Sequence, residues 1–186
     1  MDTGWADGAA VQATVTVTFI CLKGGLLTGR GPDLTGDIVV ECLEVPATVL
    51  TDVEPMACCI SARIVQERLP ARRRTLHKGE AGHLVVIGGD SSMAGAVQLA
   101  GTAALRTGAG LVTIATRHSQ INTISRSQPE LMCHAVEDQL SLETVLAGKT
   151  AVVVGPGLGQ SEWGVQMLSG VLASGLLGVV DADALN

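Results

Sequence analysis

Three short segments of the chain combine glycines with polar side chains that could bind a ligand or support a reaction on it. They are Gly88–Ala96 (Gly-Gly-Asp-Ser-Ser-Met-Ala-Gly-Ala), Gly155–Gly159 (Gly-Pro-Gly-Leu-Gly) and Asp181–Asn186 (Asp-Ala-Asp-Ala-Leu-Asn). Glycines let the backbone approach a ligand closely, and free amides at the start of a helix attract anions. Carboxylates can hold Mg²⁺ through water or accept a hydrogen bond from a hydroxyl or an amide.

Each segment also has a purely structural interpretation. Asp90 or Ser91 could simply cap a helix, Gly155–Gly159 could be only a tight turn, and Asp181 and Asp183 could cap a further helix. The residues alone favour capping in the first case and ligand binding in the last, because acids seldom stand at buried strand ends without a role. The spacing matches neither G-x-G-x-x-G nor G-x-x-x-x-G-K-[ST], so it supports neither a dinucleotide fingerprint nor a P-loop.

Two further polar residues, Lys78 and His77, are candidates for chemistry. Lys78 could bind phosphate and His77 could act as a base, but an exposed position in a linker is the favoured interpretation for both. His118 and His134 belong to no constellation of polar residues, and we expect both at the surface.

The apolar pattern predicts a regular alternation of strands and helices from residue 83 onward. Continuous apolar runs predict strands, and apolar residues at helical spacing predict helices between them. Strands are expected at His83–Gly88, Leu111–Thr116, Glu130–Val136, Thr150–Val154 and Gly178–Val180, and helices at Met93–Arg106, Ser119–Ser127, Ser141–Ala147 and Glu162–Ala173.

This alternation predicts an α/β fold with a mostly parallel sheet. Right-handed βαβ units build such a sheet and cover both of its faces with helices. Ligands of these folds gather at the carboxyl ends of the strands. Since Gly88–Ala96, Gly155–Gly159 and Asp181–Asn186 each follow a predicted strand, we expect all three on one edge of the sheet.

The first part of the chain does not show this regular alternation. Residues 13–22 and Asp37–Leu43 are rich in β-branched residues and predict two further strands. Residues 63–78 are basic around Pro70, and a solvated linker between domains is favoured over an anion-attracting rim.

Two strands cannot bury a face alone, and no helix follows the last strand, so we expect a piece of a longer protein, cut at both ends.

Composition narrows the class of protein. Hydrophobic residues make up 47%, aromatic residues only 2%, and there are 23 glycines, which is typical of a globular α/β protein with an aliphatic core. A net charge of −6 argues against a nucleic-acid partner. No signal peptide is visible and the apolar runs are too short to cross a membrane. The odd number of cysteines, five without a C-x-x-C pair, indicates reduced thiols in the cytoplasm and no cysteine metal site.

Taken together in chain order, the motifs resemble the NAD(P)H-hydrate dehydratase family over roughly residues 70–186. Residues 16–29 (Thr-Val-Thr-Phe-Ile-Cys-Leu-Lys-Gly-Gly-Leu-Leu-Thr-Gly) look like the closing strands of an NAD(P)H-hydrate epimerase domain, which is commonly fused in front of the dehydratase in bacteria. The motifs that carry the dehydratase resemblance are His77–Glu80, Gly88–Asp90, Ala94–Ala96, Ala103–Leu111, Pro129–Met132, Gly155–Gly159 and Asp181–Asn186.

The resemblance implies a bifunctional repair enzyme with a domain order that we can place on this chain. It implies the tail of a Rossmann-like epimerase domain at residues 1–50, a linker at 51–75, and the N-terminal half of a ribokinase-like α/β/α dehydratase domain at 76–186. The dehydratase would be a lyase that removes water from the S epimer of NADHX or NADPHX, with ADP as co-substrate giving AMP and phosphate. The epimerase, an isomerase, would interconvert the R and S forms.

Ligands and site residues are implied in the same way. ADP and Mg²⁺ are expected for the dehydratase and K⁺ for the epimerase, and the full-length enzyme is expected to be a homo-oligomer without nucleic-acid or membrane partners. The positions that match the substrate site of the family are Ala96, Gly157, Gly159, Asp183 and Asn186.

The sequence also departs from the family pattern. The ADP loop and the Gly-Thr-Gly-Asp anion hole with its catalytic Asp would lie beyond Asn186, and the catalytic Asp and K⁺ ligands of the epimerase would lie before Met1. Catalytic and ADP-binding residues of this chain therefore stay unassigned, and we expect weak activity or none. Two alternatives stay open: a small-molecule kinase of the ribokinase superfamily, and a non-catalytic nucleotide-binding remnant.

Overall fold

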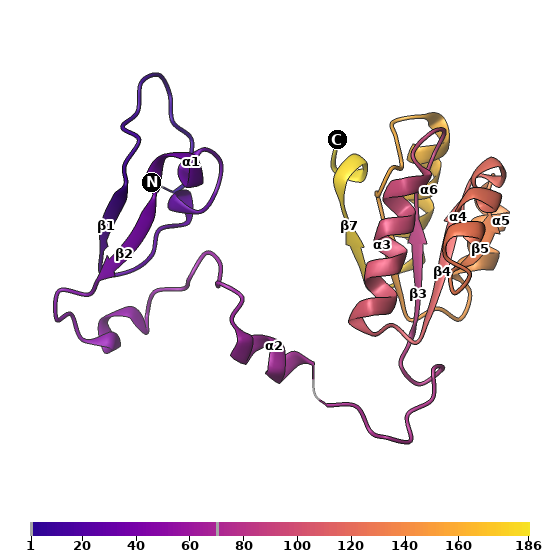
Figure 1. Ribbon diagram of the computed structural model, residues 1–186, viewed down its shortest axis with the longest axis horizontal. Helices are drawn as coiled ribbons and strands as arrows, with labels where there is room; N and C mark the ends of the chain where they lie inside the picture. The colour runs from indigo at the N-terminus through magenta and orange to yellow at the C-terminus, as the bar shows by residue number, and fades with distance from the viewer. Residues whose placement is uncertain (1, 70) are drawn as a thin grey trace. The chain divides into compact units, whose positions relative to one another are not determined.

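The computed structural model describes residues 2–69 and 71–186 and divides the chain into two compact units between Ala71 and Arg72. Figure 1 shows the course of the chain and its elements. The boundary falls inside the stretch 51–75 predicted as a linker, although helix α2 (Ala62–Arg68) forms there. Within the described residues, no helix has the length and apolar character needed to cross a membrane.

The first unit contains a two-stranded parallel sheet. Strands β1 (Val15–Phe19) and β2 (Asp37–Glu41) pair in the register Val15 with Asp37 and Phe19 with Glu41. Both strands were predicted, with longer bounds. The connection between them contains a 3-10 turn, η1 (Gly24–Leu26), and the short helix α1 (Gly31–Thr35). A second 3-10 turn, η2 (Ala47–Leu50), precedes α2.

This small sheet buries little apolar surface. Leu26, Thr18 and Thr35 are buried, but Val17 and Phe19 of β1 remain about half exposed, at 52% and 51%. Alternate residues of a strand share one face, so both side chains belong to the same open face of the sheet. The first unit therefore depends on few core contacts.

The second unit is the predicted α/β arrangement, with five parallel strands in the order β5-β4-β3-β6-β7. Helices connect successive strands, as expected when each strand is buried on both faces. The strands are β3 (His83–Ile87), β4 (Leu111–Thr116), β5 (Met132–Ala135), β6 (Ala151–Val154) and β7 (Gly178–Val180).

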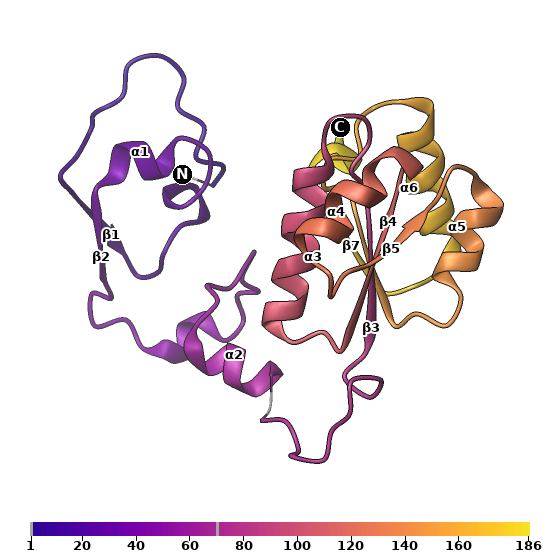
Figure 2. The same cartoon turned by 45° about the vertical axis from the view of Figure 1, so that its right-hand side comes forward.

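Four helices cover the two faces of this sheet. Helices α3 (Ala94–Thr107) and α4 (Ile121–Ser127) lie on one face, and α5 (Gln139–Leu146) and α6 (Glu162–Ser174) lie on the other (Figure 2). A 3-10 turn, η3 (His118–Gln120), precedes α4, and another, η4 (Ala182–Leu185), follows β7. Ser161 caps α6 through its side chain, and Asp138 and Ser141 form a capping box at the start of α5.

Two apolar clusters hold the layers together. Ile114 of β4 and Ile124 of α4 are fully buried on one face, and Leu142 of α5 and Met167 of α6 are fully buried on the other. Helix α3 packs closely on β4 at Gly101, where a Cβ would lie 2.6 Å from Cδ1 of Ile114. The core thus fixes α3, α6 and the strands on which the candidate site depends.

Candidate functional site

The strand order places a topological switch point between β3 and β6. From β3 the chain continues to β4 and β5 on one side, and it then returns to place β6 and β7 on the other. At such a point the two outgoing connections run in opposite directions and leave a crevice at the carboxyl ends, where open α/β sheets bind ligands. The segments Gly88–Ala96 and Gly155–Gly159 follow these two strands.

The two glycine segments are hydrogen-bonded to each other through their backbones. The Gly89 amide donates to the Pro156 carbonyl over 3.1 Å, and the Asp90 amide donates to the Gly157 carbonyl over 2.7 Å. A Cβ on Gly88 would lie 2.1 Å from the oxygen of Pro156. The close approach of the two turns therefore requires glycine at this position.

Gly157 lies against the first turn of α3. It has a φ of +61°, and a Cβ there would lie 2.8 Å from the carbonyl oxygen of Met93 and 3.2 Å from Cβ of Ala96. In the first turn of a helix the backbone amides lack helical partners and carry the positive end of the helix dipole. The structure thus brings Gly157 and Ala96 together beside a helix terminus suited to an anionic group.

The third segment reaches the same edge through Asp183. Its Oδ2 atom accepts a hydrogen bond from the Gly159 amide over 2.9 Å. Gly159, Asp183 and Asn186 also line a hollow of about 140 Å³ beside α6. All five predicted positions therefore lie at the carboxyl edge, Ala96 and Gly157 toward α3, and Gly159, Asp183 and Asn186 toward α6. Their roles stay predictions.

The helix-capping interpretation of Asp90 and Ser91 is wrong. Met93 occupies the N-cap position of α3, and no side chain caps this helix. Asp90 is instead buried, with 7% of its surface exposed, and its carboxylate accepts hydrogen bonds from Ser161 (2.7 Å) and Arg117 (3.2 Å). The carboxylate therefore accepts hydrogen bonds from side chains that are distant in the sequence, and not from the backbone amides at the start of α3.

The environment of Asp90 favours its charged form. Burial raises the pKa of this carboxyl, but the hydrogen bonds from Ser161, the Ser91 backbone and Arg117, with the charge of Arg117, outweigh burial and leave the pKa below its ordinary value. Asp90 is therefore an anion at neutral pH, held between the loops that follow β3, β4 and β6.

A pH dependence of stability follows from this lowered pKa. Since the folded state holds the charged form, Asp90 stabilises the fold above its ordinary pKa of about 3.9, and the contribution is lost as the pH falls toward the lower folded value. The difference in free energy of unfolding between the wild type and Asp90→Asn should be full at pH 7 and shrink below pH 4. Urea unfolding at several pH values measures it, and a difference that stays constant down to pH 3 would contradict the assignment.

Sequence reasoning missed the partners of Asp90. Arg117 follows β4 directly, contacts Glu137 over 2.6 Å and stacks on the Trp163 ring at 5.1 Å from the ring centre. A basic residue directly after a buried strand was a usable signal, but nothing in the sequence pairs it with Asp90. His118 and His134 are exposed, as predicted.

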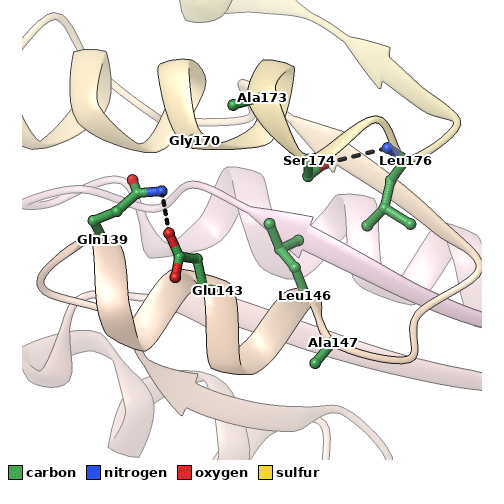
Figure 3. A pocket seen from close by; sticks show the side chains of 8 residues that line it. All are labelled: Gln139, Glu143, Leu146, Ala147, Gly170, Ala173, Ser174 and Leu176. Atoms are coloured by element: carbon green, nitrogen blue, oxygen red, sulfur yellow. Dashed lines mark hydrogen bonds between the residues drawn. The ribbon is translucent and has the colours of Figure 1, made fainter.

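A larger hollow, of about 310 Å³, lies away from the predicted site, between α5 and α6 (Figure 3). Gln139 and Glu143 on one helix are joined by a hydrogen bond of 3.0 Å, and Ser174 on the other accepts one from the Leu176 amide. None of the five predicted positions lines it. The glycine-rich edge, and not the larger hollow, thus remains the candidate site.

Comparison with known proteins identifies the family. The profile of the NAD(P)H-hydrate dehydratase family matches residues 84–186, which is more than half of the chain. The chain belongs to the NAD(P)H-hydrate dehydratase family. The matched residues include both glycine segments and Asp181–Asn186.

Relatives extend the likeness to the whole chain. A bifunctional NAD(P)H-hydrate repair enzyme from Coxiella burnetii is 44% identical over all 186 residues, and the chain spans 38% of the length of that protein. A solved ribokinase-like superfamily protein from Enterococcus faecalis has a TM-score of 0.63 at 29% identity, over 68% of this chain and 45% of the other. This NAD(P)H-hydrate dehydratase family member thus has a ribokinase-like fold, as predicted.

A solved dehydratase also matches. The ADP/ATP-dependent NAD(P)H-hydrate dehydratase from Bacillus subtilis, co-crystallised with ATP and Mg²⁺, has a TM-score of 0.57 at 30% identity, over 66% of this chain and 45% of that one. The family assignment therefore rests on both sequence and fold.

Proposed function

We propose that the second unit contributes the substrate-binding edge of an ADP-dependent NAD(P)H-hydrate dehydratase, which removes water from the S epimer of NADHX or NADPHX. The observation that carries the proposal is the convergence of Ala96, Gly157 and Asp183 at the switch point between β3 and β6. In this proposal the main-chain turns and the α3 terminus receive the anionic cofactor, and Ala96, Gly157, Gly159, Asp183 and Asn186 line its site.

The polar groups at this edge suit such a ligand. A nicotinamide dinucleotide carries a pyrophosphate and several hydroxyls. Free backbone amides at the start of a helix bind pyrophosphate, and carboxylate and amide side chains such as Asp183 and Asn186 can hydrogen-bond to hydroxyls. Small residues on the rim leave room for the backbone to approach the ligand. Bulky side chains would occupy that space.

The proposal includes ADP as co-substrate and Mg²⁺ with it. Within residues 2–69 and 71–186, no group of three or more His, Cys, Asp or Glu side chains could hold a metal ion. Mg²⁺ is commonly bound by one or two carboxylates together with nucleotide phosphates, so Asp181 and Asp183 fit a Mg²⁺ ion only in company with a nucleotide. The Mg²⁺ ion would carry the phosphates, whose own protein ligands stay unassigned in this chain, and K⁺ belongs to the proposed epimerase activity.

The domain organisation is part of the same proposal. Residues 1–50 would form the tail of an epimerase domain, 51–75 a linker, and 76–186 the N-terminal half of the dehydratase domain. The likeness of the whole chain to 38% of a bifunctional repair enzyme supports this order. A homo-oligomeric enzyme in the cytoplasm, without nucleic-acid or membrane partners, remains the accompanying prediction.

Equilibrium binding tests the proposed site. Isothermal titration calorimetry of the full chain with (S)-NADPHX should show saturable binding. Ala96→Leu should weaken it by about tenfold or more, equivalent to 1.4 kcal/mol, because the added side chain occupies the space beside Gly157. Alanine and leucine have similar helix propensities and Ala96 is exposed, so the variant should fold.

Ala103→Leu is the matched control, because Ala103 is exposed on the same helix two turns farther from the sheet edge. Its binding should equal that of the wild type. Absence of saturable binding to the wild type, or equal weakening by both variants, would refute the proposed site. Measuring AMP and phosphate release with ADP separates dehydration from the alternative of phosphate transfer to a small molecule, which would leave a phosphorylated product.

A further inference from the structure

A ring of side-chain and backbone contacts joins the loops that follow four strands of the second unit. Asp90 follows β3, Arg117 follows β4, Glu137 follows β5, and Ser161 and Trp163 follow β6. Asp90 accepts from Ser161 on one side and from Arg117 on the other. Arg117 donates to Glu137 and stacks on Trp163.

The backbone closes the ring. Trp163 Nε1 donates to the Val136 carbonyl over 2.8 Å, and the His118 amide donates to Glu137 over 2.8 Å. Thr116, fully buried, donates from its hydroxyl to the Gly89 carbonyl over 2.9 Å. Each loop is therefore bonded to at least two others, and no loop can shift without breaking a contact.

The charges in the ring depend on Arg117. Its guanidinium stands between the carboxylates of Asp90 and Glu137, and a planar group with several fixed donors can bind both at once. Without it, Asp90 would be a buried anion, at 7% exposure, with another anion nearby. An unpaired buried charge is costly, so the loops would rearrange until water reached the carboxylate.

The ring adjoins the candidate site through Asp90. A Cβ on Gly159 would lie 3.5 Å from Oδ2 of Asp90, and the Gly159 amide binds Asp183. The Asp90 amide itself binds the Gly157 carbonyl. Movement of Asp90 would therefore displace the main-chain turns that form the rim.

We propose that Asp90 and Arg117 are positioning residues that hold the four strand-end loops as one rigid rim and thereby set the affinity of the site for its dinucleotide. The affinity part of this inference rests on the proposed function. The rigidity part does not, because it concerns the loops alone.

Native-state hydrogen exchange of the full chain tests the rigidity. In Arg117→Met, amides of residues 88–93 and 155–161 should exchange about tenfold faster or more, because contacting residues in one network are coupled. The strand amides of β3 and β4 should keep their exchange rates. Arg117→Lys, which retains the charge but not the fork of donors, should restore part of the protection. Arg126→Met, at an exposed arginine of α4, should change nothing.

Binding of (S)-NADPHX to the same variants tests the affinity. Arg117→Met should raise the dissociation constant by about tenfold or more, Arg117→Lys by less, and Arg126→Met not at all. If Arg117→Met does not fold, Glu137→Gln, at a half-exposed side chain, weakens the same ring and replaces it in both measurements.

The two proposals fail in different ways. If the wild type binds no hydrate but the loops of Arg117→Met exchange faster, the proposed function fails and the rigid rim stands. Unchanged loop exchange in Arg117→Met, or faster exchange spread evenly over the whole unit, would overturn the positioning role. Faster loop exchange with unchanged affinity would overturn its link to binding.

Discussion

Gly155→Ala is expected to remove a large part of the stability of the second unit. Gly155 ends β6 with a φ of +131°, and a Cβ there would lie 1.7 Å from the backbone oxygen of Asp181. A backbone atom of the adjacent β7 connection cannot move aside as a flexible side chain could. Backbone strain and overpacking together should cost about 3 kcal/mol or more, which is a large part of the 5–15 kcal/mol typical of a domain.

Urea unfolding measures this loss. In a Trp5→Phe background the fluorescence of buried Trp163 reports the second unit alone, since these are the two tryptophans of the chain. Gly148→Ala is the control: Gly148 also has a positive φ, of +69°, but nothing lies within 4 Å of the added Cβ. It should cost about 1–2 kcal/mol from backbone strain only. Equal losses of stability in both variants would show that the collision with the Asp181 backbone oxygen does not contribute to the effect of Gly155→Ala.

Ile114→Ala is expected to have the second large effect. Ile114 is fully buried on β4 and its Cδ1 fills the space above Gly101 of α3. Truncation removes apolar contacts and leaves a cavity between helix and sheet, at a cost of about 2–5 kcal/mol. The same Trp163 fluorescence, followed against urea concentration, gives the change in free energy of unfolding.

Leu99→Ala provides the comparison on α3 itself. Leu99 is 72% exposed, so its loss should change stability by no more than about 0.5 kcal/mol. A loss for Ile114→Ala as small as that of Leu99→Ala would mean that α3 does not pack on β4 as described.

The parallel sheet of the second unit could be predicted from the sequence, because buried strands leave a simple signal. The bounds of β4 and β7 agree with the prediction, and those of the other strands and helices differ by a few residues at their ends. Helices α1 and α2 were missed. The first begins at Gly31-Pro32, a pair that also signals a turn, and the second lies in a basic segment whose side chains are nearly all exposed.

The candidate site was predictable only in part. Glycine segments at strand ends show where a parallel sheet turns, and this rule placed Gly157 and Asp183 on the same edge. The contacts of Asp90 were not predictable, because its partners lie 27 and 71 residues away. Such pairings depend on how the loops fold in three dimensions, and local preference instead suggested a helix cap.

The rim between β3 and β6 is built mainly from main chain, with glycines at Gly88, Gly155 and Gly157 where a Cβ would collide with neighbouring atoms. A substitution at any of these three glycines can only add bulk, while the side chains of Asp90 and Arg117 hold the turns in place. Variation in what this surface accepts is therefore expected at neighbouring positions such as Ala96 on α3. Engineering of ligand preference should accordingly begin on that helix.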